Sequence, residues 1–228
     1  MPYVLLNYNN ELEDVSTLAH EMGHSIHSYY SRKEQPYHYA GYTLFCAEVA
    51  STTNEKLLIH HLIEKENDEK KKLSLINTEL EQIRTTVFRQ LMFAEFELYT
   101  HESLEKGIPL TSEDYSKAWH ELNVKYFGPE MIVDENIDIE WARIPHFYSD
   151  FYVYQYATGY AAASAFANAI LEGKVNAVEK YKGFLKSGGS DYPIEILKKA
   201  GVDMTTKEPL EATIKRFNEL LDMIEKVK

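Results

Sequence analysis

The sequence contains a single cysteine, Cys46, so no disulfide can form within the chain. Basic residues are also in the minority: 24 Lys and Arg stand against 36 Asp and Glu, which gives a formal net charge of −12. Phosphate binding needs clustered Lys and Arg, so this balance argues against a nucleic-acid partner. The lone cysteine fits a reducing compartment, and we expect a cytoplasmic protein.

Long apolar runs are scarce as well. Residues 1–8 lack a basic segment followed by a long apolar stretch, so we expect no signal peptide. The longest uncharged stretch, residues 151–171, is long enough to span a bilayer, but it contains four tyrosines together with Gln155 and Asn168. A buried or site-lining helix explains this composition better, and we expect no membrane partner.

The pattern that is present predicts an all-α, mainly helical protein with a short edge strand near the N-terminus. Hydrophobic residues make up 44% of the chain, and nothing marks a boundary within residues 1–228, so a single domain is expected. Asp14 is the expected N-cap of the first helix. Residues 1–7 are the only good strand candidate, and residues 132–145 are expected to be irregular. Helices are expected at residues 14–30, 43–66, 74–105, 111–127, 154–171, 175–185, 193–200 and 208–227.

A metal-binding motif, His20-Glu21-Met22-Gly23-His24, lies in the first expected helix. Residues four apart lie on the same helix face, so both imidazoles can reach one metal ion. Glu21 lies beside them and is free to handle a water proton. Two nitrogen ligands, an open coordination position and a carboxylate base are what a zinc peptidase needs. The alternative is a chance occurrence of the pattern on a solvated helix.

A catalytic zinc usually has three protein ligands, so His20 and His24 need a third. The extended pattern H-E-x-x-H-x-x-G-x-x-H fails, because the chain has His27 and Tyr30 where it requires Gly and His. Glu48 is preferred, since a lone carboxylate on a nearly uncharged helix is costly to bury unless it is paired or metal-bound. The alternative is that Glu48 faces solvent or a buried arginine. His27 is the other candidate, although three ligands along one line of a helix cannot surround a tetrahedral ion.

Further residues could orient the ligands from outside. Zinc-bound histidines usually donate their second nitrogen to a carboxylate or carbonyl. Glu55 stands seven residues after Glu48, two turns along the same face, while Ser51 and Thr52 stand one turn along. Any of these could hold a ligand in place. The alternative for Glu55 is an exposed helix charge.

Four segments together resemble the M3 peptidases, specifically the oligoendopeptidase F branch. Gly23 and His27 complete the extended form H-E-x-G-H-x-x-H that is typical of this family, and Glu48 falls in the segment that carries its third zinc ligand. The resemblance covers essentially the whole chain and implies a zincin-type catalytic domain with one Zn²⁺ per chain. The matching segments are LAHEMGHSIHSYYS, QPYHYAGYTLFCAEVASTTNE, FRQLMFAEFE and GGSDYPIEILKKAGVD.

The resemblance also implies a tyrosine-rich loop opposite the zinc, which falls on residues 145–160. The family's transition-state stabilisers would fall on His146 and Tyr160, with Tyr152 and Tyr156 as substrate contacts. A Tyr hydroxyl or His N–H aimed at the scissile oxygen would stabilise the negative charge that develops there. The alternative is a plain aromatic core.

Family members are more than twice as long as this chain, which resembles only their C-terminal, catalytic part. The expected function is hydrolysis of internal bonds in short peptides, with Glu21 moving a proton from the attacking water to the leaving amine. Residues 4–6 could align the substrate backbone by strand addition. The alternative is a zinc-binding scaffold that is incomplete without a separate N-terminal half as its partner. A zinc hydrolase of non-peptide amides is a third possibility.

Overall fold

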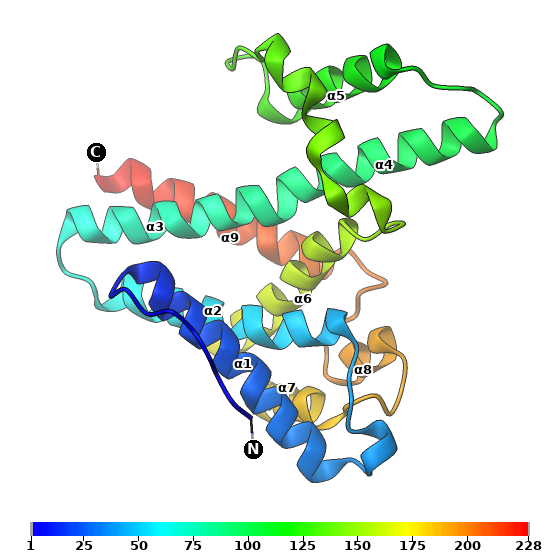
Figure 1. Ribbon diagram of the computed structural model, residues 1–228. Helices are drawn as coiled ribbons and strands as arrows, with labels where there is room; N and C mark the ends of the chain where they lie inside the picture. Colours follow the sequence, from blue (N-terminus) through cyan, green and yellow to red (C-terminus); the bar gives the residue numbers. More distant parts are fainter. Residues whose placement is uncertain (1, 228) are drawn as a thin grey trace. The chain divides into compact units, whose positions relative to one another are not determined.

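The computed structural model describes residues 2–227, which form a helical protein (Figure 1). The all-α, mainly helical fold expected from the sequence is confirmed. The single helix expected at residues 74–105 is divided into two α-helices by a π-helical turn, and the other expected helices are present with their ends shifted by a few residues. The α-helices are α1 Leu12–Glu34, α2 Leu44–Lys65, α3 Glu69–Ile83, α4 Arg89–Glu105, α5 Ser112–Phe127, α6 Tyr154–Leu171, α7 Ala177–Lys186, α8 Pro193–Lys199 and α9 Glu208–Val227. A π-helical turn, η2 Arg84–Phe88, joins α3 to α4, and the 3₁₀ segments are η1 Tyr37–Tyr39, η3 Glu135–Arg143 and η4 Pro145–Tyr148.

The expected edge strand is wrong for residues 2–7, and Met1 lies outside the described residues. Residues 2–7 form no strand, and Tyr3 and Leu5 are 95% and 98% exposed. A strand must pair its backbone N–H and C=O groups with a neighbouring strand, and the part of the chain that the structure describes contains none. An apolar run without a pairing partner therefore remains extended and irregular.

The start of α1 also differs from the expectation, because Glu11 and not Asp14 occupies the N-cap position. The Asp14 carboxylate lies in the first turn and accepts hydrogen bonds from the backbone N–H groups of Asn9 and Glu11, at 2.7 and 2.9 Å. An acidic residue in the first turn is favourable because the helix N-terminus carries unsatisfied donors and a partial positive charge. Asp14 thus supports the helix start from within.

The chain forms two compact units. The larger comprises Met1–Glu81 and Thr158–Lys228, and the smaller comprises Gln82–Ala157. Both boundaries fall inside helices, α3 and α6, so no linker sequence marks them. A single domain over residues 1–228 stays a prediction.

In the larger unit, α1 and α2 lie side by side (Figure 1). A Cβ atom added to Gly23 of α1 would lie 2.6 Å from the Cα atom of Ser51 and 2.9 Å from the carbonyl oxygen of Ala50, both on α2. These distances are too short for any side chain, so glycine is what allows the two backbones to approach this closely. The close approach occurs at the turn of α1 that contains the H-E-x-x-H motif.

The core of the larger unit is formed by apolar side chains from α2, α6, α7 and α8. Val49, Phe166, Phe184 and Leu197 represent the four helices, and each is at most 3% exposed. Helix α6 is the uncharged segment noted in the sequence, and its buried alanines allow close helix packing. Among residues 2–227, no helix combines the length and apolarity needed to cross a membrane.

In the smaller unit, α4 and α5 pack around Trp119, which is fully buried. Its ring contacts those of Phe93 and Phe96, with centroids 5.2 and 4.9 Å away. Residues 135–143, most of the segment expected to be irregular, form the 3₁₀ segment η3. It is fixed to α4 by an ion pair in which Arg89 Nη2 lies 2.6 Å from Oε1 of the buried Glu140.

Candidate metal centre

His20 and His24 lie one turn apart on α1, as their spacing predicts. Their Nε2 atoms are 3.1 Å apart, and their rings meet edge to face with centroids separated by 4.7 Å. Both side chains are half-buried. The two imidazoles therefore present one nitrogen each to a common point.

Glu48 reaches the same point from α2. Its Oε2 atom lies 3.6 Å from Nε2 of His20, and one ligand atom from each of His20, His24 and Glu48 lies within 4.8 Å of the others. Donors around a tetrahedral zinc ion are separated by about 3.3 Å, because metal–ligand distances are about 2.0–2.2 Å. Two histidines and one carboxylate are a donor set that zinc prefers, so these residues fit a zinc ion after small side-chain adjustments.

Two of the three α2 residues that were candidates to orient a ligand, Glu55 and Ser51, contact the predicted ligands. The imidazole Nδ1 of His20 forms a short hydrogen bond with the Glu55 carboxylate. The hydroxyl of Ser51 lies 3.3 Å from Oε2 of Glu48 and donates toward it. A carboxylate behind a histidine fixes the ring orientation and makes the other nitrogen a better ligand.

The same carboxylates determine the proton affinity of His20. Burial lowers its pKa, but the hydrogen bond to Glu55 and the charges of Glu55, Glu48 and Glu21 outweigh burial, so the pKa is raised. A proton and a metal ion compete for the same imidazole nitrogen. The concentration of negative charge that favours the proton equally favours a divalent cation.

Glu21 is half-buried on α1, between the two histidines in sequence. Its charge is one of those that raise the pKa of His20, so its carboxylate lies in the electrostatic environment of the group. This placement is compatible with the predicted role as general base, which stays a prediction.

His27 packs in the core. It is 1% exposed, and its ring stacks on Tyr42 with centroids 3.7 Å apart and planes 5° apart. Burial, with a smaller contribution from His24, lowers its pKa to about 3. His27 is not part of the group formed by His20, His24 and Glu48.

Tyr42 is a supporting residue that the sequence analysis missed. Its hydroxyl lies 3.3 Å from the backbone carbonyl oxygen of His24 and 2.6 Å from the Ser28 hydroxyl. Together with the stacking on His27, these contacts hold the turn of α1 that carries a predicted ligand. Tyr42 lies outside any expected helix, so no periodic pattern pointed to it.

Three of the four predicted loop residues meet in the smaller unit. The Tyr156 hydroxyl lies 3.5 Å from Nε2 of His146. The ring of Tyr152 is centred 5.9 Å from that of His146 and 5.5 Å from that of Tyr156. His146 is exposed, and both tyrosines are half-buried. The group can thus present a ring N–H and two hydroxyls to a ligand.

Tyr160, the fourth predicted residue, belongs to the larger unit. It is 2% exposed, and its buried hydroxyl has no hydrogen-bond partner in the part of the chain that the structure describes. The ammonium of Lys56 lies 3.7 Å from its ring centroid. Burial, with the charges of Glu79 and Glu55, raises its pKa well above the usual value for tyrosine. Its assignment to the oxyanion stays a prediction.

Glu97 is a second residue that the sequence analysis missed. It is 2% exposed on α4, and its Oε1 atom accepts a hydrogen bond of 2.7 Å from the backbone N–H of Phe151. Phe151 has φ of 51°, an unfavourable conformation for a side chain of this size. A buried carboxylate therefore holds the tyrosine-rich loop in a strained turn. A lone acid on an apolar helix face was the available signal.

Comparison with known proteins gives matches over nearly the whole chain. The profile of peptidase family M3 matches residues 1–216. The chain is 54% identical over 226 residues to oligopeptidase PepF of Bacillus subtilis (strain 168). It is 47% identical over 225 residues to the chromosomal oligoendopeptidase F of Lactococcus lactis subsp. cremoris. The crystal structure of oligoendopeptidase-F from Enterococcus faecium superposes with a TM-score of 0.83 at 47% identity, over 94% of this chain and 40% of that chain.

The two curated relatives are matched over 99% of this chain but over only 34% and 37% of their own lengths. The chain therefore spans about a third of the length of the relatives it matches. The segments that carry His20, His24 and Glu48 all lie within the matched residues.

Proposed function

Because the chain belongs to peptidase family M3, we propose that it carries the catalytic metal centre of a zinc-dependent oligoendopeptidase that cleaves short peptides. The observation that carries this proposal is the convergence of ligand atoms from His20, His24 and Glu48 within 4.8 Å. Two histidines and a carboxylate, with one position left open, are a donor set of catalytic zinc sites. The proposed cofactor is one Zn²⁺ per chain.

The proposed chemistry is hydrolysis of an internal peptide bond. Zinc bound at this site would polarise the substrate carbonyl and lower the pKa of water. Glu21 accepts the proton of the attacking water and then delivers it to the leaving amine. Glu55 holds the His20 ring in the orientation that directs Nε2 to the site, and Ser51 does the same for the Glu48 carboxylate.

The tyrosine-rich loop has the proposed task of binding the substrate and its developing oxyanion. His146, Tyr152 and Tyr156 supply donors from one aromatic group, and the exposure of His146 supports its assignment to substrate or oxyanion. Tyr160 must expose its hydroxyl if it is to bind the oxyanion. A Tyr160→Phe variant tests this role. Within residues 2–227 the Tyr160 hydroxyl has no hydrogen-bond partner, so its removal breaks no hydrogen bond.

The test of the proposal combines metal analysis with peptide cleavage. Elemental analysis of the purified 228-residue chain should give one zinc per chain, removable by a chelator. Cleavage of a quenched fluorescent peptide of about eight residues should be lost with the metal and restored by adding zinc. Zinc without cleavage, restored by adding the remaining part of a full-length relative, would support the scaffold alternative. Absence of zinc binding would overturn the metal centre itself.

Glu21→Gln is the variant that separates chemistry from metal binding. It should retain zinc and lower kcat by about a hundredfold or more, because the carboxylate base is gone while the ligands remain. Glu13→Gln is the matched control, as Glu13 is an exposed acid in the first turn of the same helix. The control should change neither zinc content nor kcat. Unchanged cleavage in Glu21→Gln would refute the assignment of the base.

A further inference from the structure

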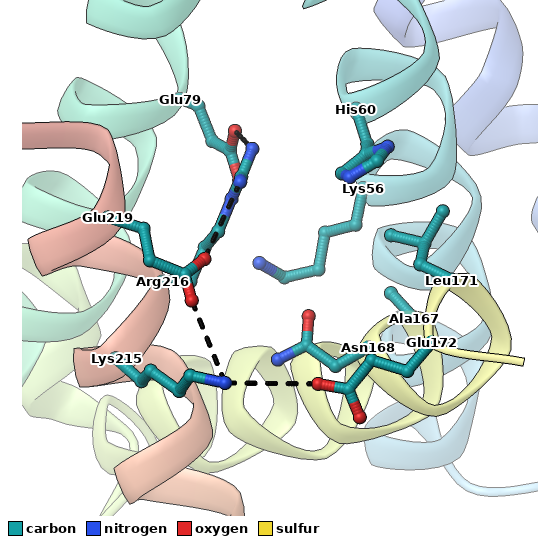
Figure 2. A pocket seen from close by; sticks show the side chains of 10 residues that line it. All are labelled: Lys56, His60, Glu79, Ala167, Asn168, Leu171, Glu172, Lys215, Arg216 and Glu219. Atoms are coloured by element: carbon teal, nitrogen blue, oxygen red, sulfur yellow. Dashed lines mark hydrogen bonds and ion pairs between the residues drawn. The ribbon is translucent and has the colours of Figure 1, made fainter. Parts of the chain in front are cut away.

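A polar cavity lies in the larger unit, between α2, α3, α6 and α9 (Figure 2). Its volume is about 210 Å³. Pockets for drug-sized ligands have about 300–1,000 Å³, so this cavity is suited to a smaller molecule. Its charged lining comes from residues far apart in the sequence, including Lys56 on α2, Glu79 on α3 and Arg216 on α9.

Lys56 is the central group of this cavity. It is only 5% exposed, and its ammonium points into the space between Arg216, Asn168 and Lys215 (Figure 2). Within residues 2–227 its ammonium has no hydrogen bond and no carboxylate within 4.0 Å. It lies over the face of the Tyr160 ring, 3.7 Å from the ring centroid. A buried ammonium is strongly disfavoured unless an anion or hydrogen-bond acceptors compensate it.

The neighbouring acids compensate the Lys56 ammonium only in part. Glu79, the one acid at the bottom of the cavity, is already engaged by Arg216 through two hydrogen bonds of 2.9 and 2.6 Å. Glu79 and Arg216 neutralise each other, and Arg216 Nη1 also lies 3.8 Å from the exposed Glu219. When Lys56 is protonated, its ammonium therefore adds a positive charge to the deep part of the cavity. Burial lowers the pKa of Lys56 to about 7, against the opposing effects of the nearby acids.

The outer charges are arranged differently. Lys215 lies at the mouth, with its ammonium 3.9 Å from Glu172 and 3.7 Å from Glu219. These two acids are more than 40% exposed, so they are solvated and compensate the outer lysine. Asn168 also lines the cavity, and within residues 2–227 its side-chain amide makes no hydrogen bond. Two donors, the ammonium of Lys56 and the amide of Asn168, are thus available to one ligand.

We propose that this cavity binds a small anion, a carboxylate or an inorganic oxyanion, whose acidic group contacts Lys56 and Asn168. One negative charge would neutralise the deep cation, and its oxygen atoms would accept hydrogen bonds from the ammonium and the amide. The size of the cavity limits the ligand to a compact molecule. The site is distinct from the metal centre, since none of its lining residues is a predicted metal ligand.

The test follows the Lys56 side chain directly by NMR. The 228-residue chain is labelled with ¹³C at lysine Cε, and the Lys56 signal is identified as the one that Lys56→Met lacks. Acetate or inorganic phosphate is then titrated at constant ionic strength. We expect a saturable shift of this signal with at least one of the two anions. A linear drift with both, shared by all lysine signals, would overturn the proposal.

Variants then test the contacts by calorimetric titration with the same two anions. Lys56→Met should weaken binding by about tenfold or more, because it removes a charge-assisted hydrogen bond. Lys65→Met, which removes an exposed lysine from the end of the same helix, should change the affinity less than twofold. Asn168→Asp adds a negative charge beside the ligand and should also weaken binding by about tenfold, with Lys56 still present. If Lys56→Met and Asn168→Asp bind the anions as tightly as the unaltered chain does, the proposed site is refuted.

Discussion

Lys56 gives the sharpest test of the electrostatics, because replacing it with methionine should stabilise the protein. Burial lowers the pKa of Lys56 from 10.5 to about 7, opposed by the charges of Glu79 and Glu55 and reinforced by Arg216. Methionine has a similar stem and no charge, so Lys56→Met keeps the packing along α2 and removes the buried ammonium. Removing a buried ammonium that no carboxylate pairs with removes the cost of its desolvation, so the change should be stabilising.

The magnitude follows from the difference between the folded and unfolded pKa. Below pH 7 both states hold the proton, and the folded state bears the full cost of about 5 kcal/mol, since each pKa unit corresponds to about 1.4 kcal/mol. Between pH 7 and 10.5 the folded state releases the proton while the unfolded state keeps it. Stability therefore rises with pH in this window, and the cost falls to about 2 kcal/mol at pH 9.

The contact of the Lys56 ammonium with the Tyr160 ring reduces the stability that Lys56→Met should gain, because a cation–π contact contributes about 0.5–2 kcal/mol and is lost in the variant. We therefore expect Lys56→Met to be more stable than the unaltered chain by about 3 kcal/mol at pH 6.5. At pH 9 the advantage should be smaller by about 2–3 kcal/mol. The direction of this pH dependence is the decisive part of the prediction.

The assay is urea unfolding followed by far-ultraviolet circular dichroism at pH 6.5, 8 and 9, in buffers without phosphate or carboxylate. Tryptophan fluorescence is unsuitable, because Trp119 and Trp141 both belong to the smaller unit. Lys65→Met is the control, and its exposed ammonium should give a difference that does not vary with pH. A destabilised Lys56→Met at pH 6.5, or an advantage that stays constant up to pH 9, would refute the reasoning.

Three further variants test the packing and support of the two sites. Gly23→Ala should lower the free energy of unfolding by about 1–3 kcal/mol and weaken zinc binding, since its methyl group would lie 2.6 Å from a backbone atom of α2; urea unfolding and a zinc titration measure the two effects. Glu55→Gln should weaken zinc binding by about 10- to 100-fold, because His20 loses its carboxylate partner; competition with a metal indicator measures it. Arg216→Met should destabilise the protein by about 3–5 kcal/mol, since it leaves Glu79 buried and unpaired; urea unfolding at pH 7 measures it.

Each of these has a matched control. Gly183→Ala introduces a methyl group on α7 with no atom within 4 Å, so it should be neutral or stabilising. Glu64→Gln removes an exposed carboxylate from the same helix as Glu55, and zinc affinity should not change. Lys215→Met removes the exposed neighbour of Arg216 and should cost under about 1 kcal/mol. A control as damaging as its test variant would show that the effect does not arise from the named contact.

The grouping of His20, His24 and Glu48 could be predicted because each step is local. Four-residue spacing places the two histidines on one helix face whatever the tertiary structure, and Glu48 was chosen as the lone acid of a nearly uncharged segment. The Glu48 side chain is 43% exposed, so the cost of burying a carboxylate, which favoured it in the sequence, does not apply in the structure. The same spacing made Glu55 one of three candidates to orient a ligand, beside Ser51 and Thr52, and the structure shows its carboxylate at Nδ1 of His20. The strand at residues 1–7 could not be judged in this way, because a strand exists only if a distant segment pairs with it.

The cavity around Lys56 shows the same limit at the proposed anion site. Glu55 and Lys56 are adjacent in the sequence, and consecutive residues on a helix point about 100° apart. One carboxylate therefore faces His20 on α1, while the next side chain faces Tyr160 and the cavity. Spacing along α2 identifies Glu55 from Glu48, but nothing along α2 indicates that α3, α6 and α9 enclose Lys56. The residues that enclose Lys56 include Arg216 and Glu219, far away in the sequence, so only the folded chain reveals that this lysine is buried.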